Sequence, residues 1–379
     1  MTTLETLALD DRRSRLLDLL RGAACAMVLV YHLNSWVPVG LGQAAVGVFF
    51  VLSGYLIAKS LVKSVEGKGW TGVKAFAVRR VCRLMPAMVG FVIGAVLLNL
   101  WLLDVDLAQL TWASVSSVLG WYNFYWLSVE PTVIGYGGIW SLSLEEQFYL
   151  TALIIVLVVR LFSDRPTVWL GTLAVLLLAW GLGWRIAAYT GLYQPPWVPY
   201  ISYLPLLRFW AFGLGVTVAL WDRVRPLTIP ERSIGTVAKT LITVGIMAWL
   251  IDSVAFYDAN TFMLQWLLVP VGGAALIRWA PAIDRVIADS ITASQRAPMV
   301  VRRLFMNGLG FCRAFGIASY SIYLWHCLVL AGFRHEGMFG STEMWWLMFW
   351  LFFTTLTPWG NATGVSDPGY NGSLKSGWL

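Results

Sequence analysis

Long apolar runs separated by short polar stretches dominate the 379-residue sequence. A helix of about 20 mostly apolar residues is long enough to cross the hydrocarbon core of a bilayer. Ten runs reach or approach this length: 16–36, 45–62, 85–103, 142–161, 167–188, 204–221, 236–251, 261–279, 315–332 and 343–357. The pattern predicts an all-α, polytopic integral membrane protein with about ten transmembrane helices.

Composition and the placement of basic residues extend this prediction. Hydrophobic residues make up 58% of the chain and charged residues only 12%, whereas about a quarter of the residues in a soluble domain are charged. Lysine and arginine gather in four stretches, which we expect to be loops or tails: 1–15, 59–83, 222–232 and 278–313. Stretches 37–44, 104–140 and 252–260 contain neither residue. The positive-inside rule then places both termini in the cytoplasm, and the net charge of +7 requires no nucleic-acid partner.

Two segments depart from this simple series of spans. Residues 112–127 are apolar enough to enter the membrane, but a full crossing there would invert the charge pattern of every later loop. We therefore expect a re-entrant or interfacial segment on the outer side. Residues 358–379 are rich in Gly, Asn and Ser and have no core-forming pattern. The chain thus divides into a transmembrane domain, 1–357, and a polar, disordered or aberrant C-terminal tail, 358–379.

The first apolar run carries charged groups that indicate a polar site. Arg21 and His32 are eleven residues apart, which is about three helical turns, so both side chains lie on one face with about 16 Å of rise between them. Charges within a bilayer are costly, so such a helix is expected to direct them into a polar cavity. His32 can act as a proton acceptor, or it can serve helix packing. Asp18, three residues before Arg21, can pair with that arginine.

Polar groups on the next two runs have both functional and structural interpretations. Ser53 and Gly54 form a small pair near mid-membrane, which suits the close approach of another helix or of a thin ligand chain. Arg80 and Arg83 share one helix face at the cytoplasmic entrance to the third span. They are placed to bind phosphates, or to set topology and contact anionic lipid.

The later runs add two carboxylates and a second histidine. Glu145 and Glu146 lie about one turn inside the fourth run, which begins near Trp140. Adjacent residues differ by 100° around a helix, so at most one of these glutamates can readily meet His32; alternatively, they complement the helix dipole. His326 lies among aromatic residues in the outer half of the ninth run. The four cysteines show no metal-ligand spacing, so the sequence predicts free thiols and no metal site.

With these residues in place, the chain resembles the membrane-bound acyltransferase 3 family, which comprises integral O-acyltransferases of surface polysaccharides and related acceptors. Five motifs carry the resemblance, and they occur in the order typical of the family. They are Asp18-x-x-Arg21-Gly22 with Arg-x10-His to His32, GVFFVLSGYL at 47–56, Arg80-x-x-Arg83 with Pro86, WSLSLEEQFY at 140–149, and SYSIYLWH at 319–326. The resemblance spans residues 18–326.

The resemblance implies a function and a set of site residues. A family member would transfer an acyl group, usually acetyl, from cytoplasmic acyl-CoA to a hydroxyl of a cell-surface or lipid-linked saccharide. His32 would be the catalytic base, with Arg21 in the same essential motif. Further expected roles are catalysis for Glu145 and Glu146, donor binding for Arg80, Arg83 and Ser53, and substrate binding for His326 and Trp140. The expected partners are acyl-CoA as donor substrate, the saccharide and membrane lipid, with no tightly bound cofactor and no nucleic acid.

The sequence leaves other functions open. Intramembrane charges on ten helices would also suit a transporter that moves acylated or lipid-linked glycans without catalysis. The tail at 358–379 departs from the family's closing helix and Glu-x-Pro end, so an inactive paralogue retained as an assembly partner is a third hypothesis. The expected location is a bacterial inner or plasma membrane.

Overall fold

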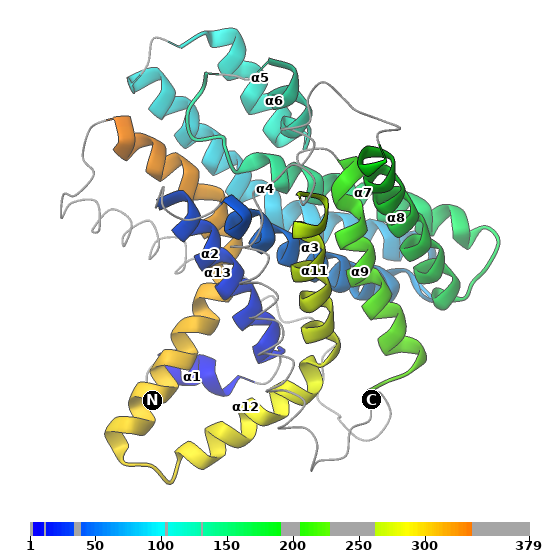
Figure 1. The fold of residues 1–379 in the computed structure, drawn as a ribbon, viewed down its shortest axis with the longest axis vertical. Coiled ribbons are helices and arrows are strands. Elements are labelled where there is room, and N and C mark those ends of the chain that lie inside the picture. Colours follow the sequence, from blue (N-terminus) through cyan, green and yellow to red (C-terminus); the bar gives the residue numbers. More distant parts are fainter. Residues whose placement is uncertain are drawn as a thin grey trace.

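The computed structural model describes residues 3–10, 13–33, 39–102, 105–129, 132–190, 205–227 and 262–335. Over these ranges the chain is helical and contains no strand (Figure 1), which confirms the predicted all-α class for the described part. The helices are α1 (Thr3–Leu9), α2 (Arg15–Leu33), α3 (Val39–Val65), α4 (Gly69–Leu102), α5 (Leu107–Val118), α6 (Tyr122–Val129), α7 (Ile139–Arg160), α8 (Pro166–Tyr189), α9 (Pro205–Val224), α11 (Phe262–Arg278), α12 (Ala280–Ser294) and α13 (Met299–His335).

Within the described residues, six helices are long and apolar enough to cross a membrane: α2, α3, α4, α7, α8 and α13. Each coincides with one of the predicted runs, and α9 and α11 occupy two more. The runs at 236–251 and 343–357 lie outside the described residues, as does the tail at 358–379. The total of ten spans and the cytoplasmic placement of the termini therefore stay predictions.

Two basic stretches expected to be loops are largely helical. Between 59 and 83, α3 continues to Val65 and α4 begins at Gly69, so only a short turn separates them. Gly67 and Gly69 have φ values of +70° and +55°, a conformation that favours glycine and closes this turn. Between 278 and 313, α12 and the first part of α13 occupy most of the stretch. Lysine and arginine are good helix formers, so a helix can continue where its apolar pattern ends.

The central helix α3 packs against α2, α4, α7, α9 and α11 (Figure 1). Its contact with α9 depends on glycine. A methyl group on Gly54 would lie 2.2 Å from the carbonyl oxygen of Phe212, and one on Gly215 would lie 2.1 Å from the carbonyl oxygen of Val51. The small pair at Ser53 and Gly54 therefore serves helix packing at Gly54.

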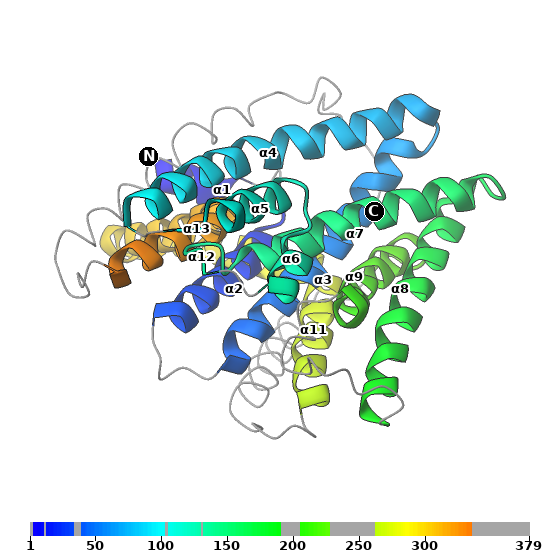
Figure 2. The same cartoon turned by 90° about the horizontal axis from the view of Figure 1, so that it is seen from above.

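Helices α2 and α13 also cross at glycines, with α13 lying between α4 and α2 (Figure 2). A methyl group on Gly316 would lie 1.8 Å from the carbonyl oxygen of Asp18, and one on Gly22 would lie 3.0 Å from that of Cys312. This close backbone contact fixes the relative height of the two helices along their shared face.

A buried ion pair closes the lower end of this crossing. Arg313 of α13 donates from Nη2 to Asp18 Oδ2 at 3.2 Å, and both side chains are almost fully buried. The same guanidinium donates from Nη1 to the carbonyl oxygens of Leu7 and Asp10, which holds α1 against α13. The sequence allows Asp18 to pair with Arg21 on its own helix, and in the structure its ion pair is with Arg313, 295 residues away.

The segment 112–127 forms parts of two short helices, α5 and α6, joined by a turn at Gly120 with φ +71°. Neither helix is long enough to span a bilayer, which agrees with the predicted re-entrant or interfacial segment. Asn99 of α4 holds the chain that follows, because its side chain donates to the carbonyl oxygen of Ile134 and accepts from the same residue's N–H. Tyr136 lies in this chain between α6 and α7, and burial raises the pKa of its hydroxyl.

Candidate active site

Most of the candidate site residues form two groups, one at each end of the face shared by Arg21 and His32. Helix α2 is continuous from Arg15 to Leu33, so the eleven-residue spacing does place these two side chains on one face, about 16 Å apart along the axis. We call the group around His32 the histidine cluster, comprising His32, Ser141, Tyr323, His326 and Cys327. We call the group around Arg21 the arginine cluster, comprising Arg21, Ser53, Arg80, Arg83, Glu145 and Tyr149.

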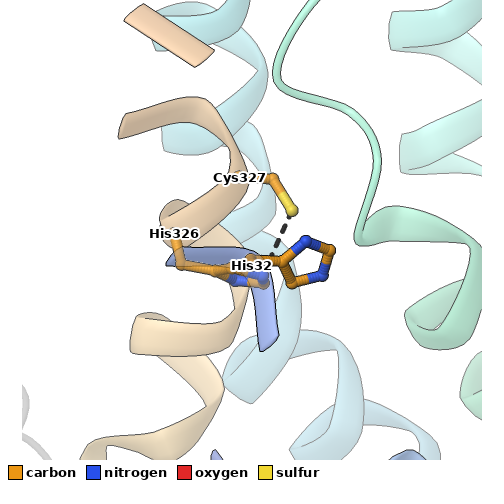
Figure 3. A group of neighbouring side chains, drawn as sticks. All are labelled: His32, His326 and Cys327. Carbon is orange, nitrogen blue, oxygen red and sulfur yellow. Dashed lines mark hydrogen bonds between the residues drawn. The ribbon is translucent and has the colours of Figure 1, made fainter. Parts of the chain in front are cut away.

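The histidine cluster joins α2 to α13 (Figure 3). The ring centroids of His32 and His326 are 4.9 Å apart. His326 is 4% exposed, and its Nδ1 bonds to the carbonyl oxygen of Tyr323. A carbonyl can only accept, so Nδ1 carries the proton, and the lone pair of Nε2 faces Cys327 Sγ at 3.1 Å.

Helix α7 completes this cluster. The hydroxyl oxygens of Ser141 and Tyr323 are 2.6 Å apart. Gly138, the residue before α7, lies against the histidine cluster: a methyl group there would be 3.3 Å from both His326 Cε1 and Cys327 Sγ. Glycine at this position thus keeps the space beside the second imidazole open.

The arginine cluster places one carboxylate among three guanidinium groups. Glu145 of α7 accepts hydrogen bonds from Ser53 of α3 and Tyr149 of α7. The charges of Arg80, Arg21 and Arg83 all act on this carboxylate. The Arg80 guanidinium lies 5.2 Å from the centre of the Tyr149 ring. With three guanidinium groups and a single carboxyl group, the cluster has an excess of positive charge that suits a polyanionic ligand.

The remaining two candidates lie at the edges of these clusters. Glu146 packs against the α5–α6 turn, where a methyl group on Gly120 would lie 2.5 Å from its Oε2. Trp140 is 6% exposed and contacts the Phe50 ring at a centroid distance of 6.5 Å. The guanidinium of Arg208, a buried residue of α9, lies 5.9 Å from the centre of the Trp140 ring.

The structure brings together most of the residues expected from the sequence. His32 and His326 meet, and Arg21, Arg80, Arg83, Ser53 and Glu145 share one cluster. Sequence reasoning missed Cys327, Tyr323, Ser141 and Arg208. A signal was available for Arg208, which is the only arginine or lysine within the apolar run 204–221. Cys327 gave no signal, because its partners His32 and His326 come together only in the fold.

The two clusters can perform complementary chemistry. An imidazole can accept a proton from a hydroxyl and return it to a leaving group. A cluster of guanidinium groups can hold phosphates through charge-assisted hydrogen bonds. Among the described residues, His32, His326 and Cys327 also form a group whose ligand atoms all lie within 4.8 Å of one another, which is close enough for them to share a metal ion.

Comparison with known proteins gives a consistent result. The sequence profile of the acyltransferase 3 family, described as an acyltransferase domain, matches residues 15–359. No solved structure matches the chain.

Relatives in three bacteria cover most of this chain. Peptidoglycan O-acetyltransferase OatA of Listeria monocytogenes is 28% identical over 321 residues, 82% of this chain and 48% of OatA. A protein of Komagataeibacter xylinus provisionally named membrane-bound transacylase BcsY is 29% identical over 337 residues, 86% of this chain and 75% of its own length. A protein of Staphylococcus aureus provisionally named O-acetyltransferase is 26% identical over 325 residues, 83% of this chain and 50% of its own length.

The chain spans about half the length of the Staphylococcus and Listeria relatives. The profile match covers most of the chain, from the helix that carries Arg21 and His32 to beyond the helix that carries His326. Together with the six apolar helices, it shows that this multi-pass membrane protein belongs to the acyltransferase 3 family.

Proposed function

We propose that the protein is a membrane-bound O-acyltransferase that moves an acetyl group from cytoplasmic acetyl-CoA to a hydroxyl of a cell-surface or lipid-linked saccharide. The observation that carries this proposal is the arrangement of two polar clusters along one face of α2. The arginine cluster lies toward the end expected in the cytoplasm, and the histidine cluster lies toward the end expected outside. A donor and an acceptor from opposite sides of the membrane would meet between them.

The arginine cluster suits the donor. Coenzyme A carries several phosphates on one end of a long flexible arm and its thiol on the other. Arg21, Arg80 and Arg83 offer planar guanidinium groups that bind phosphate oxygens in pairs. The charges of these arginines act on the Glu145 carboxyl group, so phosphates bound there would meet the same cations. The arm would then extend along α2 toward His32.

The histidine cluster suits the chemical step. His32 would accept the proton of the acceptor hydroxyl while its oxygen attacks the thioester carbonyl. A carbon–oxygen bond forms and the carbon–sulfur bond breaks, so the leaving thiolate of coenzyme A takes up the proton that His32 received. Such proton transfer contributes about 10²–10⁴-fold to a rate. His326 and Trp140 would line the path of the acceptor, and the roles of Glu145 and Glu146 in catalysis stay predictions.

The relatives support this choice of reaction and location. OatA is named for O-acetylation of peptidoglycan, a saccharide polymer outside the bacterial membrane, and BcsY is provisionally named as a membrane-bound transacylase. We infer the corresponding location for this chain, the plasma or inner membrane of a bacterium. The acceptor of this chain would be a saccharide as well.

The test is acyl transfer from radiolabelled acetyl-CoA in permeabilised membranes that contain the chain, with glycans extracted and counted. His32→Gln keeps the size and hydrogen bonding of the side chain but removes the base, so label should fall about 100-fold or more. Val30→Ala changes a 47%-exposed residue on the same helix and should retain full transfer. Glycan label no higher than in membranes without the chain would contradict the proposed function. Transfer that survives His32→Gln would instead leave an acyltransferase that uses another base.

A further inference from the structure

The three side chains at the upper end of the α2–α13 crossing have the chemistry of a soft-metal site. His32 and His326 offer imidazole nitrogens and Cys327 offers a sulfur (Figure 3). Nitrogen and sulfur ligands select Zn²⁺ and similar cations over Mg²⁺ or Ca²⁺, which prefer oxygen. We propose that this cluster binds Zn²⁺ or a similar transition-metal cation, and that the bound cation inhibits the enzyme by occupying the nitrogen that His32 needs as a base.

The distances fit such a site after small movements of the side chains. With zinc–nitrogen bonds of about 2.05 Å and a zinc–sulfur bond of about 2.3 Å, ligand atoms in a tetrahedral site lie about 3.3–3.6 Å apart. The Nε2 atom of His326 is 3.1 Å from Cys327 Sγ, slightly closer than in such a site, and all three ligand atoms are within 4.8 Å of one another. The His32 side chain is partly exposed, so we expect it to rotate toward the other two ligands when the cation binds.

The surroundings of the ligands also favour metal binding. His326 donates from Nδ1 to the carbonyl oxygen of Tyr323, which fixes the ring and leaves Nε2 to coordinate, as is usual for metal-bound histidines. Cys327 must lose its proton to bind. It lies against Gly138 at the N-terminal end of α7, where the helix dipole stabilises a thiolate.

Inhibition follows from the position of His32 and rests on the proposed function. An imidazole nitrogen bound to a metal has no lone pair left to accept a proton. The three protein ligands leave a fourth position that water can occupy. Metal binding itself does not depend on the proposed reaction, so the two can be tested separately.

Binding is tested on the purified full-length chain in detergent, titrated with Co²⁺ as a spectroscopic probe. A thiolate ligand gives a charge-transfer absorption band in the near ultraviolet, and Zn²⁺ should abolish this band by displacement. Cys327→Ala should lose the band. Cys312→Ala should keep it, because Cys312 is an exposed thiol on the same helix outside the cluster. A band that persists in Cys327→Ala, or that is absent from the parent chain, would overturn the proposed site.

Inhibition is tested by acyl transfer in membranes with increasing Zn²⁺. With each chain's rate expressed relative to its own rate without Zn²⁺, loss of a ligand should raise the half-inhibitory concentration about 10–100-fold in Cys327→Ala. Equal sensitivity of Cys327→Ala and the parent chain, or stimulation by Zn²⁺, would refute inhibition through this cluster. If neither chain transfers acetyl, the proposed function fails and inhibition fails with it. The cobalt band then decides the metal site alone.

Discussion

The contact between α2 and α13 predicts a strong effect of one methyl group placed far from the chemistry. A methyl group on Gly316 would lie 1.8 Å from the carbonyl oxygen of Asp18 and 2.7 Å from its carbonyl carbon. Contacts of this type are essentially never shorter than 3.0 Å, so the two helices must separate by about 1.2 Å. The obstructing atoms belong to the backbone of α2 and cannot turn aside. Gly316→Ala should therefore destabilise the fold by about 1–3 kcal/mol, the usual cost of overpacking.

This separation should also change activity. His32 and His326 lie on these same two helices, with their ring centroids 4.9 Å apart. A displacement of about 1 Å in a catalytic arrangement can reduce a rate about 100-fold. We therefore expect Gly316→Ala to lower acetyl transfer per folded molecule by about this factor, even where the protein remains in the membrane.

The assay combines acetyl transfer with thermal unfolding of the detergent-solubilised chain, so that rate and folded fraction are measured together. Two other glycines give a graded comparison. A methyl group on Gly22 would lie 3.0 Å from the nearest atom, whereas one on Gly308 has nothing within 4 Å. Gly22→Ala should show a smaller loss, and Gly308→Ala should be neutral or slightly stabilising. Full activity and unchanged unfolding temperature for Gly316→Ala would refute the reasoning.

Three further predictions concern the donor site, the buried ion pair and the segment before α7. Arg80→Ala should raise the KM for acetyl-CoA about 10–100-fold, because hydrogen bonds to a charged group are lost. Lys74 is an exposed residue of the same helix, so Lys74→Ala should leave the KM unchanged. Equal KM values for the two variants would show that Arg80 does not bind the donor. Arg313→Ala leaves Asp18 buried without its ion-pair partner and should lower the free energy of unfolding by about 3–5 kcal/mol, an effect that a chemical unfolding curve would reveal or exclude. Asn99→Leu removes two hydrogen bonds to the following segment and should speed its cleavage by protease in folded protein; an unchanged cleavage rate would contradict the anchoring role.

The periodic features of the site could be read from the sequence. The spacing of Arg21 and His32 fixes their shared face, because helix geometry is local and does not depend on the rest of the fold. The placement of Arg80 and Arg83 on one helix face followed from the same rule. Glycines at close crossings were visible as small residues, but the sequence could not identify their partners.

Other features required the fold. Asp18 has a possible partner three residues away in Arg21, yet its ion pair is with Arg313 on a distant helix. The two histidines are 294 residues apart in sequence, and no periodic pattern relates them. Cys327 has no motif spacing; it follows His326 directly in the sequence, and its proximity to His32 comes from the packing of α13 against α2.

The class of helical membrane protein and the acyltransferase 3 pattern can be read from the sequence alone, because apolar run lengths and short motifs are local properties of the chain. Only the tertiary structure decided how the polar residues divide into an arginine cluster and a histidine cluster. It also placed a thiol beside the two imidazoles. These contacts join helices that are distant in sequence, and the close backbone packing at Gly22 and Gly316 holds two of those helices together.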